Sequence, residues 1–413
     1  MASFSFGAGN ARKILSLPLY ALGRVGTALV PRTRSRWVFG CAVGIADGAL
    51  ALWEVAAARG EDTVWLTGSA EESREAQARG IRHRPKRGVG GWWATARARV
   101  VVVTHGFGDV NRYGVTGAFV VQLWHGIPLK RIGLDSAETV RSGILPRSRM
   151  VRAALRGAYA RAASRIRVLP AASELVRGRL ESAFGLPSAR VPVTGEPRVD
   201  VLSRGTADDR RAAATARLRA LLGALPGSRV VLYAPTWRDG APDPAVPDAA
   251  QWRLIVAALE SADAVLLVRS HPLGAGEYRP PEPTERVRRL GSEVVADVTP
   301  LLPALDLLIT DYSSLAFDAA LVPVPVLFLA PDLEAYRERR GLYGRYADVA
   351  GEDWARDWAS LLPRMGEVLA DPDAARARAF ALSERVHAFR DGRNAERVYD
   401  AIRAGLGARK ETR

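Results

Sequence analysis

Short apolar runs alternate with helix-like stretches along most of the chain, and this alternation limits the possible folds more than any other feature. The runs predicted to be strands lie at 37–43, 62–66, 99–104, 118–123, 165–169, 191–194, 228–233, 264–269, 293–295, 305–309 and 324–329. The stretches predicted to be helices lie at 49–60, 151–164, 173–184, 208–222 and 251–261. Strands that alternate with helices are typical of a doubly wound parallel sheet, so we predict an α/β fold.

The length of the chain predicts more than one domain. A chain of 413 residues exceeds what one hydrophobic core usually organises. We expect two Rossmann-like, doubly wound domains that face each other across a cleft, an N-terminal one at 36–205 and a C-terminal one at 206–385. A basic segment at 1–35 precedes them, and a C-terminal helix within 386–413 is expected to cross back to the N-terminal domain.

The composition is that of a soluble globular protein with a strongly basic surface. Hydrophobic residues make up 48% of the chain, and the formal net charge is +15. Such a surface attracts polyanions, although coding bias in an Ala- and Arg-rich sequence also explains part of the charge. Because no nucleic-acid-binding motif accompanies the charge, we expect no nucleic acid partner. The single cysteine, Cys41, excludes an internal disulfide and fits a reducing compartment.

The N-terminal segment is basic and amphipathic. Its apolar stretch at 14–22 is far shorter than the roughly 20 residues that span a bilayer. Basic residues flank this stretch, namely Arg12, Lys13, Arg24, Arg32, Arg34 and Arg36. We therefore expect a peripheral protein at the cytoplasmic face of the membrane, where this segment lies on anionic lipid. The alternative is a helix packed on the first domain.

Histidines follow predicted strands in both halves of the chain. His125 follows the run at 118–123, and His271 follows the run at 264–268. Ligands of doubly wound folds bind at the carboxyl ends of strands, and neutral histidine can accept a proton from an attacking hydroxyl. We therefore take His125 as the candidate base, the alternative being a histidine hydrogen-bonded within its turn. His105 is a further candidate at a strand end.

A hydroxyl-rich turn follows the apolar run at 305–309. Its residues are Thr310, Asp311, Tyr312, Ser313 and Ser314, and a helix-like stretch follows them. Serine hydroxyls and unpaired N–H groups at a helix start form a phosphate-binding site. The alternative is an ordinary helix cap.

Several segments together resemble the CDP-glycerol glycerophosphotransferase family, which includes the teichoic acid primases and polymerases. They occur in family order over nearly the whole chain, at 124–133, 195–200, 232–239, 269–272, 310–314, 332–337, 340–343 and 391–392. The resemblance implies a GT-B fold and transfer of glycerol phosphate, or a related alditol phosphate, from a CDP-alditol donor. A hydroxyl of a lipid-linked or polymeric acceptor would receive the alditol phosphate, and CMP would leave. The resemblance implies that the reaction needs neither a metal nor a cofactor.

The resemblance also implies roles for individual residues. His125 would be the base, and His271 would assist the transferring phosphoryl group. The residues expected to bind the donor, chiefly its pyrophosphate, are Ser313, Ser314, Asp311, Tyr312, Thr236, Arg238 and Arg269. The residues expected on the acceptor side or in the cleft are Trp124, Gly126, Lys130 and Arg198.

Three positions depart from the family pattern and leave the alditol open. Ile127 stands where such enzymes usually have Thr, Glu196 replaces an apolar or aromatic residue, and Ser270 replaces a common Leu. The sequence is also compatible with two other functions. One is a GT-B transferase that uses a nucleotide sugar, and the other is a non-catalytic protein that binds polyanions at the membrane surface.

Overall fold

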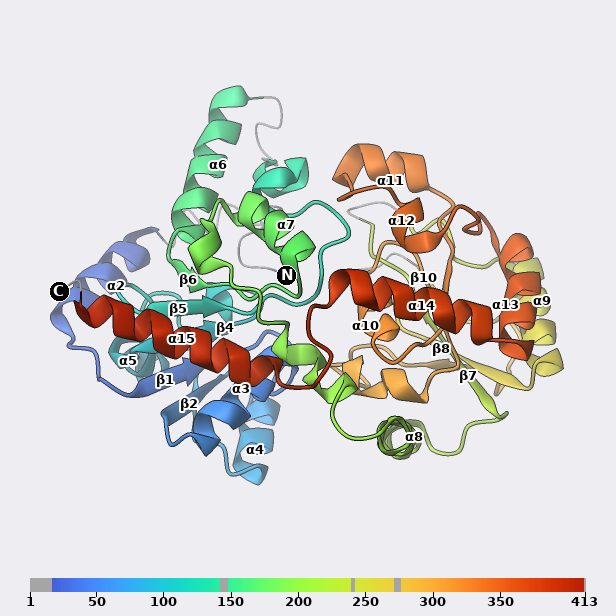
Figure 1. The fold of residues 1–413 in the computed structure, drawn as a ribbon, viewed down its shortest axis with the longest axis horizontal. Helices are drawn as coiled ribbons and strands as arrows, with labels where there is room; N and C mark the ends of the chain where they lie inside the picture. The colour runs from blue at the N-terminus through green and yellow to red at the C-terminus, as the bar shows by residue number, and fades with distance from the viewer. Residues whose placement is uncertain (1–16, 142–147, 239–241, 271–275, 412–413) are drawn as a thin grey trace. The chain divides into compact units, whose positions relative to one another are not determined.

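The computed structural model describes residues 17–141, 148–238, 242–270 and 276–411, which divide into two compact units (Figure 1). The first unit comprises Met1–His125, Arg131–Asp200 and Asp391–Arg413, and the second comprises Gly126–Lys130 and Val201–Arg390. We expected the domain boundary after residue 205, and the structure divides the chain after Asp200. The C-terminal segment belongs to the first unit from Asp391 onwards.

The first unit contains a six-stranded sheet in the order β3-β2-β1-β4-β5-β6, and all neighbouring strands are parallel. The strands are β1 (Arg36–Phe39), β2 (Asp62–Thr67), β3 (His83–Pro85), β4 (Val100–Val103), β5 (Phe119–Gln122) and β6 (Ile166–Val168). The α-helices of this unit are α2 (Leu17–Leu29), α3 (Asp47–Ala58), α4 (Ala70–Ala78), α5 (Val89–Arg97), α6 (Arg149–Ala163), α7 (Glu174–Phe184) and α15 (Asn394–Glu411). The predicted α/β fold with parallel sheets is confirmed.

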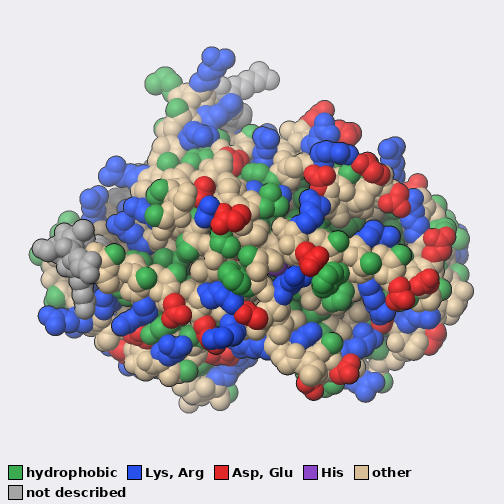
Figure 2. Space-filling model, viewed as in Figure 1, with side chains coloured by type: hydrophobic (Ala, Val, Ile, Leu, Met, Phe, Trp, Pro, Cys, Tyr) green, Lys and Arg blue, Asp and Glu red, His purple; other side chains and the backbone are tan. Residues whose placement is uncertain are grey.

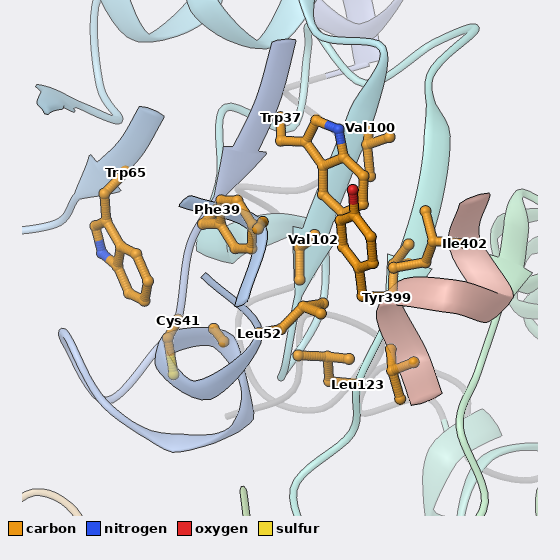
Figure 3. Close-up of a cluster of buried hydrophobic side chains, with 14 of the residues drawn as sticks. Trp37, Phe39, Cys41, Leu52, Trp65, Val100, Val102, Leu123, Tyr399 and Ile402 are labelled. Atoms are coloured by element: carbon orange, nitrogen blue, oxygen red, sulfur yellow. The ribbon is translucent and has the colours of Figure 1, made fainter. Parts of the chain in front are cut away.

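The core of the first unit contains a row of aromatic rings, and the C-terminal helix packs against it. Trp37, Phe39 and Trp65 lie in a row, with 6.2 Å between neighbouring ring centroids (Figure 3). Tyr399 of α15 stacks on Trp37 at 5.5 Å, and α15 packs on α3. Each buried side chain of this size contributes about 1.5–3 kcal/mol, so α15 is an integral part of the first unit.

The start of α15 is held by an aspartate from a distant part of the chain. The Asp200 carboxylate accepts hydrogen bonds from the backbone N–H groups of Asn394 (2.9 Å) and Ala395 (2.8 Å). The first N–H groups of a helix have no partner within the helix, so this carboxylate caps α15. The 195–200 segment of the sequence is therefore joined to the start of α15, which follows the 391–392 segment closely in the sequence.

The second unit contains a five-stranded parallel sheet in the order β11-β10-β7-β8-β9. The strands are β7 (Arg229–Ala234), β8 (Ala264–Val268), β9 (Val287–Arg289), β10 (Leu307–Thr310) and β11 (Val326–Phe328). The α-helices of this unit are α8 (Ala207–Leu222), α9 (Ala249–Ser261), α10 (Leu315–Ala320), α11 (Leu333–Arg340), α12 (Ala347–Ala350), α13 (Trp358–Ala370) and α14 (Asp373–Val386). The strand order reverses between β7 and β10, and such reversals are where ligands of doubly wound folds bind.

Two predicted strands are wrong. Residues 191–194 make only an isolated bridge, between Ala171 and Val193, because Pro192 has no N–H group to donate to a ladder. Residues 293–295 lie in a turn, where the N–H groups of Val294 and Val295 both donate to the carbonyl of Gly291.

The basic composition is visible on the surface, where Lys and Arg side chains are spread among carboxylates over the face in view (Figure 2). None of the helices in the described part of the chain is both long and apolar enough to cross a membrane.

Candidate functional site

Two histidines come together at the carboxyl edge of the first sheet. β4 and β5 are neighbouring parallel strands, so the residues that follow them leave the sheet at the same edge. His105 follows β4 and His125 follows β5, and their rings stack with 4.4 Å between centroids and 5° between planes. The Trp124 ring lies 4.2 Å from that of His125. The ring of the candidate base, His125, therefore lies against the rings of both His105 and Trp124.

The backbone around His125 adopts a conformation that side chains rarely tolerate. Trp124 has φ = 63°, and Gly126, on the other side of the histidine, has φ = 131°. Trp124 is buried and packs edge-on against Phe184 at 5.2 Å. A left-handed conformation at a non-glycine residue costs roughly 1–3 kcal/mol and persists only where packing holds it. The contacts of Trp124 with Phe184 supply that packing and fix the direction of His125.

Asp109 holds the turn that carries His105. Its carboxylate accepts hydrogen bonds from the backbone N–H groups of Thr104 (2.9 Å), His105 (2.7 Å) and Gly106 (3.2 Å). Burial raises the pKa of Asp109, and these hydrogen bonds oppose the rise. The Thr104 hydroxyl lies 2.8 Å from His105 Nδ1. The His105 ring is thus fixed from both its backbone and its side chain.

His105 is a neutral imidazole at pH 7. Burial lowers its pKa to about 4, and the positive charge of Arg198 contributes to the shift. Arg198 lies in the 3₁₀ turn Pro197–Leu202, and its Nε is 3.5 Å from a carboxylate oxygen of Asp47 at the start of α3. His125 can accept a proton beside His105 without facing a second charged ring.

In the second unit, Arg238 ties the ends of β7 and β10 together. Its guanidinium donates to Asp311 at 2.7 Å, to the two carboxylate oxygens of Asp332 at 2.8 Å each, and to the carbonyl of Thr236. Burial opposes the charged form of Arg238, but the carboxylates of Asp332 and Asp311 raise its pKa above the usual range. The other oxygen of Asp311 accepts the backbone N–H groups of Thr236 (2.8 Å) and Tyr312 (2.6 Å).

Tyrosines enclose this ion pair. Tyr312 and Tyr336 stack at 3.8 Å, and the Arg238 guanidinium lies 4.9 and 5.1 Å from their ring centroids. The Tyr312 hydroxyl donates to Asp332 (2.9 Å), and the Tyr346 hydroxyl donates to the Asp311 carbonyl (2.9 Å). Burial, followed by the charge of Asp332, raises the pKa of Tyr312. These aromatic contacts fix the turn after β10 from inside the unit.

The hydroxyl groups near this turn are placed differently. Ser313 and Ser314 are partly exposed, whereas Tyr312 and Asp311 are buried. The Thr236 hydroxyl is buried and has no hydrogen-bond partner among the described residues. The helix that follows, α10, has only six residues, so its dipole adds less to phosphate binding than the sequence suggested.

Arg238 and Arg269, which the sequence suggests as donors to the phosphates, both have partners within the second unit. The Arg238 side chain is 5% exposed, and its guanidinium pairs with two carboxylates. The Arg269 guanidinium donates to the backbone carbonyls of Leu290 (3.1 Å), Val295 (2.8 Å) and Ala296 (2.9 Å). Each arginine satisfies acceptors within the second unit, and the sequence pattern does not reveal these pairings.

The other predicted residues fall in both units. Trp124, His125 and Arg198 lie in the first unit, whereas Gly126 and Lys130 belong to the second, where the Leu129 carbonyl accepts from the Tyr343 N–H at 2.9 Å. His271 lies outside the described residues. In the described ranges, no three His, Cys, Asp or Glu side chains form a group that could hold a metal ion.

Sequence reasoning gave no role to several residues that build these sites, namely Asp109, Asp332, Tyr336 and Tyr346. Asp332 and Tyr336 stand in one of the segments that carried the family resemblance. That position was a usable signal, but the sequence does not show that Asp332 pairs with Arg238.

The two parallel sheets, with polar residues at their carboxyl edges, define the class of the protein as GT-B-like. The solved structure of the wall teichoic acid polymerase TagF has this fold and superimposes with a TM-score of 0.74, at 20% identity, over 97% of each chain. The model of the CDP-Glycerol:Poly(glycerophosphate) glycerophosphotransferase family matches residues 36–404. The chain belongs to this family.

Two curated relatives carry related names. The teichoic acid glycerol-phosphate transferase of Staphylococcus aureus is 30% identical over 233 residues, which cover 55% of this chain and 56% of that protein. The teichoic acid poly(glycerol phosphate) polymerase of Bacillus spizizenii is 29% identical over 231 residues, 54% of each chain. The matched region thus spans about half the length of these relatives.

Proposed function

We propose that the protein transfers glycerol phosphate, or a related alditol phosphate, from a CDP-alditol donor to a hydroxyl of a lipid-linked or polymeric acceptor, releasing CMP. The product would be a teichoic acid or a similar cell-wall or capsule polymer. Family membership supports this reaction class. The structural observation that carries it is the half-buried His125, fixed in a strained turn at the carboxyl edge of the first sheet.

His125 acts as the base. The acceptor hydroxyl attacks the phosphorus atom that carries the alditol, while His125 removes the hydroxyl proton. The bond from this phosphorus to the bridging oxygen of CMP breaks, and CMP leaves with the electron pair. His105, stacked on His125 and neutral at pH 7, is a positioning residue.

The second unit binds the donor. The hydroxyls of Ser313, Ser314 and Thr236 lie at the ends of β10 and β7, where the strand order reverses, and would hydrogen-bond the pyrophosphate. Arg238, Asp311 and Tyr312 are positioning residues that hold these two turns. Arg269 holds residues 290–296 in the same way. The assistance of His271 to the phosphoryl group is part of the proposal and rests on the family resemblance.

TagF supports the choice of donor by analogy. It has been solved as variants that each replace one histidine, and one of these variants was soaked with CDPG. For this chain we infer a CDP-alditol donor, a lipid-linked acceptor and a peripheral position at the cytoplasmic face of an anionic membrane. Lys130 and Arg198, the basic residues proposed for the acceptor side, lie in the segments 124–133 and 195–200.

A donor screen with the purified protein tests this proposal. We expect CMP release from CDP-glycerol or CDP-ribitol in the presence of an acceptor, and no release of UDP or GDP from sugar nucleotides. His125→Ala should lower turnover by about 100-fold or more, because losing a general base usually costs that much. His83→Ala, at the opposite edge strand β3, is the matched control and should stay near wild type. Turnover of a sugar nucleotide, or a His125→Ala variant as active as the control, would contradict the proposal.

A further inference from the structure

A basic cavity lies at the amino ends of strands in the first sheet, whereas the histidine pair lies at the carboxyl ends. It measures about 340 Å³, and four arginines line it: Arg24, Arg161, Arg165 and Arg167. Ala118 and Arg165 immediately precede β5 and β6, so the cavity lies at the amino ends of these strands. His125 follows the carboxyl end of β5, so the cavity is separate from the candidate catalytic edge.

The four arginines have no acidic partner among the residues that the structure describes. None of them appears in an ion pair or a side-chain hydrogen bond there, whereas most other arginines of this unit do. Burial lowers the pKa of Arg165, and the like charges of Arg24 and Arg161 lower it further. An anion in the cavity would relieve this repulsion, and guanidinium groups bind phosphate oxygens with paired hydrogen bonds.

The opposite wall of the cavity is rigid. Arg32 donates hydrogen bonds to the carbonyls of Thr95 (3.0 Å) and Gly114 (3.1 Å), and also to those of Ala98 and Thr116. This guanidinium fixes the turn that ends at Ala118, where Gly117 has φ = 88°. The cavity is therefore formed before any ligand arrives, which lowers the entropic cost of binding.

The helix that contributes Arg24 presents an apolar surface to solvent. Leu22, Val25 and Leu29 of α2 are 67%, 61% and 79% exposed, and their i, i+3, i+7 spacing places them on one face. On the inner face, Thr27 is buried and Gly23 contacts Tyr113 so closely that an added Cβ would lie 2.5 Å from its carbonyl oxygen. Exposed leucines beside a basic cavity are typical of a helix that lies in a membrane interface.

We propose that this cavity binds the phosphate of an anionic lipid headgroup while the exposed apolar face of α2 enters the bilayer interface. The inference deepens the proposed function, on which it rests for the membrane setting. A lipid is the occupant that explains both observations, because a soluble anion would need the arginines but not the leucines.

Vesicle flotation with the full chain, without any CDP-alditol, tests the proposal. The protein is mixed with vesicles of phosphatidylcholine alone or of an equal mixture with phosphatidylglycerol. Arg24→Gln with Arg161→Gln removes two exposed charges from the cavity. Its matched control is Arg74→Gln with Arg87→Gln, which removes two exposed charges near the other end of the sheet. For the apolar face, Leu22→Ser with Leu29→Ser is compared with Val89→Ser with Leu175→Ser.

We expect the wild type to bind the anionic vesicles and not those of phosphatidylcholine alone. Each basic residue at an anionic surface strengthens binding about fivefold. The cavity pair, which is the variant with Arg24→Gln and Arg161→Gln, should therefore bind at least about tenfold more weakly than the wild type. The serine pair on α2 should also bind at least about tenfold more weakly, and both controls should stay within about twofold of wild type. Thermal unfolding checks that every variant is folded.

Three results would overturn the proposal. The first is equal weakening by the cavity pair and its control, which would indicate diffuse attraction. The second is equal binding to both kinds of vesicle. The third is displacement from vesicles by soluble poly(glycerol phosphate), with the serine pair on α2 unaffected, which would make a soluble polyanion the ligand. Since no donor is present, failure here leaves the transfer reaction untouched, and failure of the donor screen leaves vesicle binding testable.

Discussion

Arg238 connects several groups of the second unit's candidate site. It pairs with Asp311 and Asp332 and lies over the rings of Tyr312 and Tyr336. A buried ion pair of this kind adds little net stability compared with an apolar replacement of both partners, but it fixes geometry. Because Asp311 also accepts the Thr236 N–H, the pair sets the distance between the turns after β7 and β10.

Replacing the Thr236 hydroxyl should affect donor binding much more than the stability of the fold. We expect Thr236→Val to change the free energy of unfolding by less than about 1 kcal/mol, because the lost hydroxyl has no partner among the described residues. The KM for CDP-glycerol should rise by roughly tenfold, because a hydrogen bond to a charged phosphate contributes about 1.5–3 kcal/mol. Urea unfolding and steady-state kinetics measure the two effects. A large loss of stability with an unchanged KM would show that the hydroxyl has a structural role.

The low pKa of His105 predicts a pH dependence of stability. Its pKa is about 4 in the folded protein and 6.5 in the absence of perturbation. Between these values the unfolded chain binds more protons, so the stabilisation is complete above about pH 6.5 and is lost as the pH falls towards 4. This group alone should lower the free energy of unfolding of the first unit by about 2–3 kcal/mol.

Urea unfolding between pH 7 and pH 4 tests this dependence. His105→Gln should flatten the slope, while His83→Gln should keep it. The groups near His105 that also titrate or carry charge are His125, Asp109 and Arg198. An unchanged slope in His105→Gln would assign the dependence to another group that titrates in this pH range.

At the scale of elements, the joint between Asp200 and α15 determines whether the C-terminal helix docks. We expect Asp200→Ala to destabilise the first unit by about 2 kcal/mol or more, because a lost cap costs about 0.5–2 kcal/mol and Asp200 is buried. Asp357→Ala, which removes the exposed cap of α13, should cost about 1 kcal/mol or less. Calorimetric unfolding of both variants makes the comparison, and equal losses would mean that Asp200 is only an ordinary cap.

Strands were predicted best where they are buried on both faces. The runs at 99–104, 118–123 and 264–269 correspond to β4, β5 and β8, because fully buried parallel strands consist of continuous apolar residues. The run at 191–194 failed at Pro192, and β9 at Val287–Arg289 was missed because two of its three residues are arginines. Apolar runs thus identify the central strands and the edge strands β6 and β11, and they miss the polar edge strands β3 and β9.

At the scale of the whole molecule, donor binding should stabilise one unit. CDP-glycerol at about 100 times its Kd should stabilise the second unit by about 2.7 kcal/mol. Hydrogen exchange should show greater protection in β7 and β10, with β1 and β4 unchanged, because the proposed donor residues lie at the ends of β7 and β10. Greater protection confined to β1 and β4 would place the donor in the first unit and contradict the assignment.

The sequence by itself determined the α/β class, the family and the segments that carry the candidate chemistry. Local patterns suffice for these, because strand and helix periodicity and short motifs are properties of neighbouring residues. His125, Ser313 and Ser314 could be chosen in this way, because each lies in the short segment that follows an apolar run.

Only the tertiary structure decided what the polar residues contact. The pairing of Arg238 with Asp332, the stacking of His105 on His125 and the capping of α15 by Asp200 join residues 94, 20 and 194 positions apart. Such contacts depend on which strands become neighbours and which way each side chain faces, and no local pattern encodes either. The same reason explains why four arginines, from α2, α6, β6 and the turn before β6, line one cavity that the sequence showed only as scattered charge.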